Sequence, residues 1–337
     1  MSGNRLLTAI VVLAGLLALT VFMWNKRASE DAAPPEVTAK VPKIKKDDVT
    51  ELTVKAPGKT EVTLTKTDGA WKLTAPLSAD ADKDAVDTAL SKLDELTFVA
   101  VAATKPENHE KLEVTDGKGV HVVAKQGEKL LGDIWIGTYL SGNTMLRSQG
   151  ETNVATVKGS MKYAFDKDLK DWRDRAVVDV KSDDVKAISF ASKNGTYNFV
   201  KEGTEWKQAA GDKPIANYDA NKVSSLVSTL VSLRANDFAA DGVTADSAGV
   251  GATPVGTVTL TTAADAGDSQ ILLRVGNKKD AGYYATREGK QPIYIVSEYA
   301  GERMMPTLDK LQKDEPGSRS NPIAVHPEPA KKPAGHP

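Results

Sequence analysis

The strongest constraint on the fold of this chain is an internal duplication, because two stretches of its sequence align with an offset of about 136 residues. Asp47-Asp48-Val49 corresponds to Asp183-Asp184-Val185, and each triplet is followed by two short runs of alternating apolar residues. A Trp-Lys pair comes next in both copies, as Trp71-Lys72 and Trp206-Lys207. Each copy, at about 130 residues, is large enough to enclose its own hydrophobic core.

A helix and a second group of strands complete each copy. Apolar residues three or four positions apart predict one amphipathic helix per copy, with the stripes Val86, Leu90, Leu93, Leu96 and Val223, Val227, Leu230, Leu233. Alternating apolar runs then continue to residue 157 in the first copy and residue 296 in the second. We therefore expect an α+β fold: two tandem copies of a mostly antiparallel sheet, each packed with one amphipathic helix, after an N-terminal transmembrane helix.

The N-terminal region predicts a membrane anchor. Residues 6–24 contain no charged side chain, and as a helix they would span roughly 28 Å, close to the hydrocarbon thickness of a bilayer. The run ends in the bulky residues Phe22, Met23 and Trp24, which suit an interfacial anchor better than a signal-peptidase site. We expect a retained anchor, with residues 1–5 as a short cytoplasmic end; a cleaved signal peptide is the alternative.

The remaining boundaries follow from composition. Residues 25–44 contain a Pro34-Pro35 pair and no apolar periodicity, which indicates a linker. The first repeat is expected at residues 45–175 and the second at 176–312. Residues 313–337 hold six prolines and little to bury, which predicts a disordered Pro-rich tail.

Composition excludes several classes of function. The chain has no cysteine, so disulfide scaffolds, thiolate metal sites and cysteine nucleophiles are excluded, and it has only four histidines. The net charge of −1 provides no overall field for nucleic acid. His109-Glu110-Lys111-Leu112-Glu113 lacks the second histidine of a zinc site, and the Asp80, Asp82, Asp84 triplet fits a helix N-cap better than a calcium loop. With no Walker or nucleophile-elbow motif, we expect neither an enzyme nor a cofactor.

Seven residues are candidates for binding or packing. Trp71 and Trp206 are expected to pack against their own helices, or to form an exposed platform for sugar or peptide. Arg147 and Arg287 are expected to link strands to acidic neighbours, or to hold a ligand. Trp172, Arg173 and Arg175 lie where the copies join, and we expect inter-repeat packing and charge pairing, or a partner contact.

With these motifs assembled, the sequence resembles the bacterial family catalogued as domain of unknown function 4340, over about residues 45–312. The resemblance rests on four segments: Trp71-Lys72-Leu73…Pro76, Ala81-Asp82, Asp168-Leu169…Trp172-Arg173-Asp174-Arg175, and Gly276…Tyr284…Arg287. It implies a single-pass protein of the bacterial inner (cytoplasmic) membrane, with the bulk of the chain periplasmic or otherwise extracytoplasmic. One departure is that the second copy has no evident counterpart to His109–Leu112, so a role there would be confined to one copy.

The family resemblance also implies a function. Members are often associated with ABC-type transport systems similar to those of gliding motility. We therefore expect a non-enzymatic accessory or scaffold subunit whose partners are a multi-pass membrane subunit and an ABC ATPase. The alternative is an envelope glycan- or solute-binding module with a ligand in a cleft between the copies.

Overall fold

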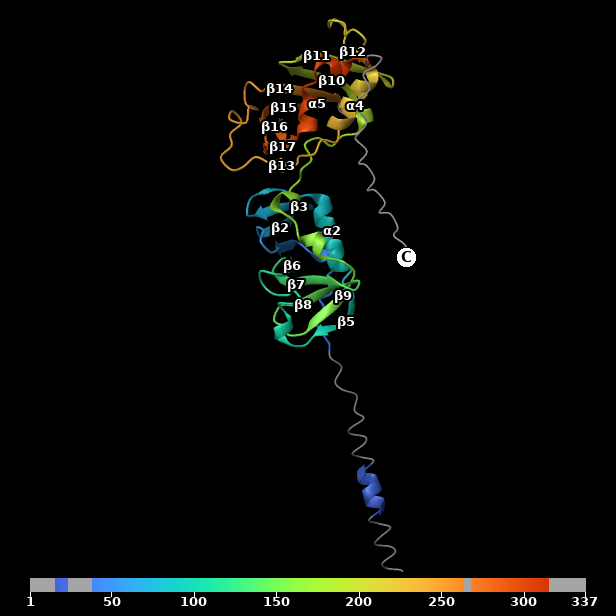
Figure 1. The fold of residues 1–337 in the computed structure, drawn as a ribbon, viewed down its shortest axis with the longest axis vertical. Coiled ribbons are helices and arrows are strands. Elements are labelled where there is room, and N and C mark those ends of the chain that lie inside the picture. The colour runs from blue at the N-terminus through green and yellow to red at the C-terminus, as the bar shows by residue number, and fades with distance from the viewer. Residues whose placement is uncertain (1–15, 24–37, 264–267, 315–337) are drawn as a thin grey trace, which may run out of the picture. The chain divides into compact units, whose positions relative to one another are not determined.

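A computed structural model describes residues 16–23, 38–263 and 268–314 of the chain. These residues form an α+β structure with two mostly antiparallel sheets, as the duplication predicts, and the chain divides into two compact units between Trp172 and Arg173 (Figure 1). Each sheet belongs to one unit, and each unit has its own core.

The first unit is built on a nine-stranded sheet in the order β4-β3-β2-β1-β6-β7-β8-β9-β5. All of its paired strands are antiparallel. Its strands are β1 (Glu51–Lys55), β2 (Val62–Thr67), β3 (Ala70–Ala75), β4 (Ala79–Asp80), β5 (Phe98–Ala103), β6 (Val120–Gln126), β7 (Lys129–Leu140), β8 (Asn143–Ser148) and β9 (Val154–Lys158).

The second unit repeats this plan with an eight-stranded antiparallel sheet in the order β12-β11-β10-β14-β15-β16-β17-β13. Its strands are β10 (Val185–Ser192), β11 (Gly195–Glu202), β12 (Glu205–Gln208), β13 (Asp237–Phe238), β14 (Gly256–Thr262), β15 (Ser269–Lys279), β16 (Gly282–Arg287) and β17 (Tyr294–Ser297). A 3-10 turn precedes the first strand of each sheet, η1 (Lys46–Asp48) before β1 and η4 (Ser182–Asp184) before β10.

One amphipathic helix of the predicted position lies in each unit. α2 (Lys83–Asp94) buries Val86, Ala89, Leu90 and Leu93, and α4 (Ala220–Leu230) buries Val223, Leu226, Val227 and Leu230. Asp82 caps α2 through a hydrogen bond from the Ala85 amide, and Asp219 caps α4 through one from the Asn221 amide. The apolar stripes thus become the helical side of each core as far as Leu93 and Leu230, whereas Leu96 and Leu233 lie beyond the helix ends, and the aspartates before the helices act as caps.

A short second helix follows the last long hairpin of each unit. α3 (Lys162–Phe165) has four residues and α5 (Glu298–Met304) has seven. Both helices end on a fully buried apolar residue, Phe165 in the first unit and Met304 in the second. α5 is thus three residues longer than α3.

The last residues of the predicted linker and the first residues of the predicted tail lie within the folded units. Ile44 is only 3% exposed in the first core, and the Lys40 carbonyl accepts a hydrogen bond of 2.8 Å from Ser148 Oγ. Lys222 forms an ion pair of 2.6 Å with Asp314, two residues beyond residue 312. Residues 25–37 of the predicted linker and 315–337 of the predicted tail lie outside the described residues.

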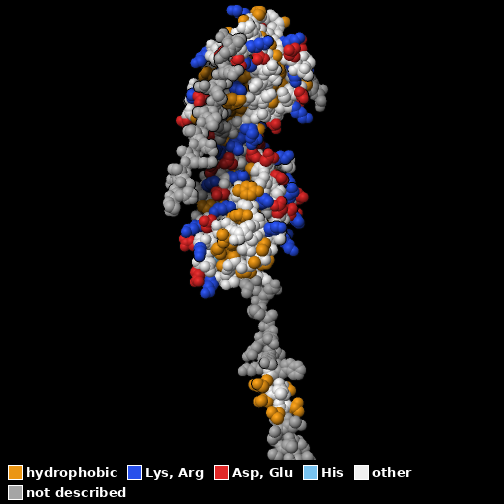
Figure 2. Space-filling model, turned by 45° about the vertical axis from the view of Figure 1, so that its right-hand side comes forward, with side chains coloured by type: hydrophobic (Ala, Val, Ile, Leu, Met, Phe, Trp, Pro, Cys, Tyr) orange, Lys and Arg blue, Asp and Glu red, His pale blue; other side chains and the backbone are white. Residues whose placement is uncertain are grey.

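The predicted membrane anchor also lies mostly outside the described residues. Residues 16–23 are helical, and the apolar side chains of Leu16, Phe22 and Met23 are exposed (Figure 2). Within the described ranges, none of the helices has the length and apolar character needed to span a bilayer. A membrane-spanning helix over residues 6–24 therefore stays a prediction.

The expectation that the second copy lacks a counterpart to His109–Leu112 is wrong. The Val114 amide donates to the His109 carbonyl at 2.9 Å, and the Val250 amide donates to the Ala245 carbonyl at 2.8 Å. The residue before each valine has positive φ, 57° at Glu113 and 71° at Gly249. Both copies thus have the same loop. The sequence did not reveal it, because the two loops share a main-chain conformation but not their side chains.

Candidate ligand-binding pocket in the second unit

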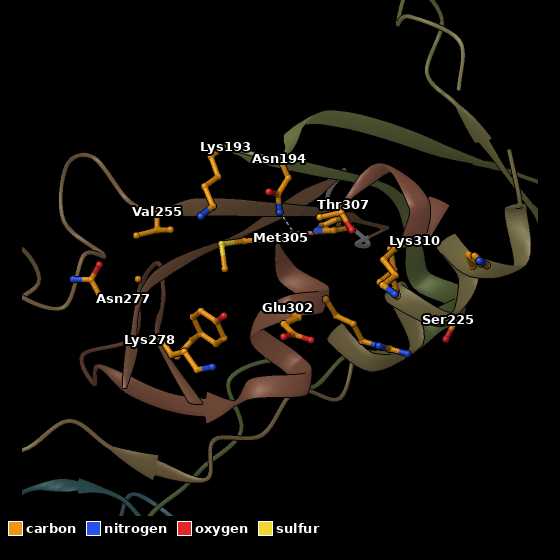
Figure 3. A pocket seen from close by; sticks show the side chains of 16 residues that line it. Lys193, Asn194, Ser225, Val255, Asn277, Lys278, Glu302, Met305, Thr307 and Lys310 are labelled. Atoms are coloured by element: carbon orange, nitrogen blue, oxygen red, sulfur yellow. Dashed lines mark hydrogen bonds between the residues drawn. The ribbon is translucent and has the colours of Figure 1, made fainter. Parts of the chain in front are cut away.

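A pocket of about 770 Å³ opens on the second unit (Figure 3). Its wall is formed by the turn between β10 and β11, one side of α4, the ends of β15 and β16, and the segment from α5 to Lys310. These elements are far apart in the sequence, so only the folded unit brings them together. The volume lies within the range of roughly 300–1,000 Å³ that is usual for small-molecule sites.

The centre of the pocket is apolar. Leu226 of α4 and Pro306, both buried, belong to its wall, and the side chains of Tyr283 and Met305 are half-buried there. Val255 adds an exposed aliphatic side chain. A ligand in this position would bury apolar surface of its own against these groups.

Cationic side chains surround this apolar centre. Figure 3 shows Lys193, Lys278 and Lys310 on different sides of Met305. Lys278 pairs with Glu298, and Lys310 pairs with Asp309 at 3.4 Å. The hydrogen bond to Glu298 raises the pKa of Lys278, and the hydrogen bond from Thr307 lowers the pKa of Asp309. Lys278 and Lys310 thus each already have a carboxylate partner.

Arg303 and Lys193, by contrast, have no carboxylate partner among the described residues. Arg303 donates from Nε to Thr229 Oγ1 at 3.2 Å, and its guanidinium lies 3.8 Å from the centre of the Tyr299 ring. Lys193 is exposed and makes no hydrogen bond or ion pair within the part of the chain that the structure describes. The wall itself includes one acidic residue, Glu302. An anionic group that entered the pocket would therefore find two positive charges not already neutralised by a carboxylate.

A glycine shapes one side of the pocket. Gly276 lies in β15, where the pairing with β16 shifts between Val275 and Lys278. A Cβ atom at position 276 would lie 2.0 Å from the Ala248 carbonyl oxygen, and the next amide, of Asn277, donates to that same oxygen at 2.8 Å. The first unit repeats this approach at Gly137, where a Cβ would lie 2.2 Å from the Leu112 carbonyl oxygen. In both copies glycine permits the 112–114 or 248–250 loop to lie directly on the sheet.

The predicted tryptophans lie in the cores rather than on an exposed platform. Trp206 on β12 is 4% exposed and belongs to the second core, which α4 helps to form. Trp71 on β3 is half-buried against the first core, which α2 helps to form. Neither residue lines the pocket.

The predicted arginine pair has different partners from those expected. Arg147 donates from Nε to the Val114 carbonyl at 2.9 Å, and Arg287 donates from Nη1 to the Val177 carbonyl at 3.1 Å. Burial lowers the pKa of the Arg147 guanidinium. The expectation of acidic partners is thus corrected: both guanidinium groups bind main-chain carbonyls and hold loops to the sheets.

The residues at the junction contribute to separate units. Trp172 is 1% exposed in the first core, and its carbonyl accepts a hydrogen bond of 2.9 Å from the Asp82 amide. Arg173 lies 3.5 Å over the ring of Phe238 in the second unit, where burial lowers the pKa of its guanidinium. The Arg175 carbonyl accepts a hydrogen bond of 2.8 Å from the Ala235 amide. Predicted inter-repeat contacts stay a prediction.

None of the seven candidates lines the pocket, and no sequence motif marks the residues that do. Lys193 and Asn194 form an ordinary polar hairpin turn in the sequence, and Met305-Pro306 looks like a helix end. Across the described ranges, no group of three or more histidine, aspartate and glutamate side chains is arranged to hold a metal ion.

A family model described as "Domain of unknown function (DUF4340)" matches residues 71–250, which is more than half of the chain. The matched region runs from β3 of the first unit to the loop before β14 of the second. Comparison with curated proteins and with solved structures gives no match.

Proposed function

The chain belongs to the DUF4340 family, and on that basis we propose that it is a non-enzymatic accessory subunit of an ABC-type transport or gliding-motility-like envelope complex. In this proposal residues 6–24 anchor the chain in the bacterial inner membrane and both α+β units lie outside the cytoplasm. Its partners would be a multi-pass membrane subunit and an ABC ATPase.

The observation that carries the proposal is a pair of α+β units that follow a long uncharged segment. Residues 6–24 are long enough to cross a bilayer as a helix, and the described chain after residue 38 is folded into the two units. The predicted site residues are engaged in packing or in main-chain hydrogen bonds, as with Trp206 and Arg287. Such a chain is suited to present surfaces at a membrane.

The proposal is tested by purifying the tagged full-length protein from its own membranes in mild detergent and identifying co-purifying proteins by mass spectrometry. We expect an ABC ATPase and a multi-pass permease in a fixed ratio to the tagged chain. Recovery of the protein without them would contradict the proposal. A tagged single-pass protein of unrelated sequence, purified in parallel, controls for nonspecific recovery.

The pocket of the second unit favours a second candidate function, that of a solute-binding module. It combines an apolar centre at Met305 and Tyr283 with the cations Lys193 and Arg303, which have no carboxylate partner among the described residues. An enclosed apolar volume with a few charged groups is the usual form of a small-molecule site. The two candidates are compatible, since an accessory subunit can also bind a solute.

A further inference from the structure

In each unit the loop between the first two strands contacts the end of the short second helix. The two units differ in the residues that meet there. In the first unit this place is occupied by an ion pair network. Lys59, in the loop between β1 and β2, lies 3.0 Å from Asp166 Oδ1 and 3.4 Å from Asp168 Oδ1, and its Nζ also donates to the Asp166 carbonyl. The hydrogen bond to Asp166 raises the pKa of Lys59.

A matching hydrogen bond identifies the same place in the second unit. Asn194, in the turn between β10 and β11, donates from Nδ2 to the Met305 carbonyl at 2.8 Å. Asp166 directly follows α3 and Met305 directly follows α5, so both hairpins bind the carbonyl at the end of the equivalent helix. Counted from that helix end, Met305 and Thr307 stand where the first unit has Asp166 and Asp168.

The second unit thus has Asn194 in the role of Lys59, a cation beside it at Lys193, and no carboxylates at the positions that correspond to Asp166 and Asp168. Lys193 lies beside Asn194 on the hairpin and has no hydrogen bond or ion pair among the described residues. The space next to it is the pocket of about 770 Å³, with Met305 at its centre (Figure 3). The first unit thus shows, within the same fold, a carboxylate bound where the second unit has an opening.

The other walls of the pocket limit the charge and the shape of a ligand. Lys278 and Lys310 already have carboxylate partners, and Glu302 would repel a second negative charge. These features favour a single anionic head over a polyanion. Met305 and Tyr283 would gain nothing from a bare inorganic anion, whereas an apolar body would be buried against them.

We propose that the pocket of the second unit binds an amphiphilic anion, with one carboxylate or phosphate head and an apolar body. The head lies by Lys193, in the place that the carboxylates of Asp166 and Asp168 occupy in the first unit, and the body lies against Met305 and Tyr283. This inference rests on the solute-binding candidate above and does not depend on the transport partners.

The test is a titration of the full-length protein in phosphatidylcholine nanodiscs, followed by the NMR signals of ¹³C-labelled methionine methyl groups. Met305 reports on the pocket, and Met145, 6% exposed in the first unit, is the internal control. We expect octanoate and methyl octyl phosphate, a singly charged phosphodiester, to shift the Met305 signal in a saturable way and to leave the Met145 signal unchanged. Neutral 1-octanol and octyltrimethylammonium should bind at least about tenfold more weakly.

A pair of charge variants tests the position of the head. Lys193→Gln should weaken octanoate binding about fivefold, a loss in the range of one exposed charge pair. Lys66→Gln, which removes an exposed lysine from β2, is the matched control and should bind octanoate as the wild type does. Both lysines are exposed, so neither substitution is expected to disturb folding.

Further measurements distinguish a membrane lipid from a soluble anion and specify which results would overturn the proposal. A Met305 shift in nanodiscs containing phosphatidylglycerol, without added amphiphile and reduced by Lys193→Gln, would identify a membrane lipid as the ligand; no such shift beside octanoate binding would identify a soluble anion. The proposal is overturned if 1-octanol binds as well as octanoate, if Met305 does not respond, or if the peptide acetyl-Glu-Asp-Leu-Glu-Asp-amide binds more tightly. Any of these results would leave the co-purification test of the accessory function untouched.

Discussion

The first and second units share a fold but treat the end of their last helix differently. In the first unit α3 has four residues, and Lys59 pairs with Asp166 and Asp168 directly after it. In the second unit α5 has seven residues and is followed by Met305 and Thr307, beside a pocket. The first copy thus has internal ion pairs at this position, whereas the second copy has a pocket there.

The comparison also shows what both copies require. The loop that ends at Val114 or Val250 lies on the sheet beside a glycine, and an arginine at Arg147 or Arg287 binds a main-chain carbonyl. These shared features hold the fold, whereas the residues that follow the last helix differ between the two copies. Substitutions in both copies, together with the pH dependence of the second unit, test this division.

Truncation of the buried residue that ends each short helix should have the largest effect. Phe165→Ala should cost the first unit about 3–5 kcal/mol, and Met304→Ala should cost the second about 2–5 kcal/mol, because both side chains are fully buried. Because each unit has its own core, hydrogen exchange measured peptide by peptide should accelerate mainly in the unit that carries the substitution. Equal acceleration in both units would contradict the separation of the two cores.

Alanine at the equivalent glycines should destabilise both units by a similar amount. Gly137→Ala and Gly276→Ala each place a Cβ within 2.2 Å of a main-chain carbonyl oxygen, so we expect a loss of about 1–3 kcal/mol in either unit. Chemical denaturation measures the loss, with exposed Ser232→Ala as a control that changes stability by less than about 0.5 kcal/mol. A loss in only one unit would show that the loop is not equivalent in the two copies.

Alkaline pH should weaken the second unit through Tyr218, which directly precedes the N-cap of α4, where the first unit has Ala81. Burial, with Asp219 and Glu205 nearby, raises the pKa of Tyr218 to about 12, above its ordinary value of about 10. A raised folded-state pKa means that the neutral hydroxyl is favoured by folding. Its contribution is complete below about pH 10 and is lost as the pH rises towards about 12.

The variant Tyr218→Phe isolates this effect. It removes the hydrogen bond of 2.9 Å to the Trp206 carbonyl, so the second unit should lose about 0.5–1.5 kcal/mol at neutral pH. The part of the alkaline destabilisation that is due to Tyr218 should then disappear, as measured by denaturation at several pH values. An unchanged alkaline profile in the variant would assign that loss to other groups.

The smallest effect should come from the hairpin lysines. Lys59→Met removes the pairs with Asp166 and Asp168 and should cost the first unit no more than about 1 kcal/mol, since these groups are partly exposed. Lys193→Met removes a side chain without partners among the described residues and should leave the stability of the second unit within about 0.5 kcal/mol. Equal losses of stability in the two variants would contradict the difference between Lys59, which has ion-pair partners, and Lys193, which has none among the described residues.

Much of the fold could be predicted from the sequence because it depends on local periodicity. The stripes from Val86 and Val223 became the buried sides of α2 and α4, and the acidic residue before each helix became its cap. The α+β class followed from strands on both sides of one helix in each copy. These signals repeat, so each copy supported the interpretation of the other.

The pocket could not be predicted, for two physical reasons. Its lysines look like any solvated lysines in the sequence, because only folding brings Lys193, Met305 and Lys310 into the wall of one pocket. The corresponding residues of the two units also do not align at the repeat offset of about 136. Asp166 and Met305 are 139 residues apart, because α5 is longer than α3. The loop after His109 was missed because hydrogen bonds and positive φ define it rather than residue type.

The central claim is that the second unit leaves open the place that carboxylates occupy in the first. The variant Thr307→Asp tests it directly, because position 307 corresponds to Asp168 when counted from the helix end. The measurement is an octanoate titration of this variant and the wild type in phosphatidylcholine nanodiscs, with the methyl signal of Met305 as the reporter. A carboxylate built into the second unit should compete for Lys193 and weaken octanoate binding about tenfold or more, while the Met145 signal stays as in the wild type. Octanoate binding of unchanged affinity in the folded variant would contradict the account.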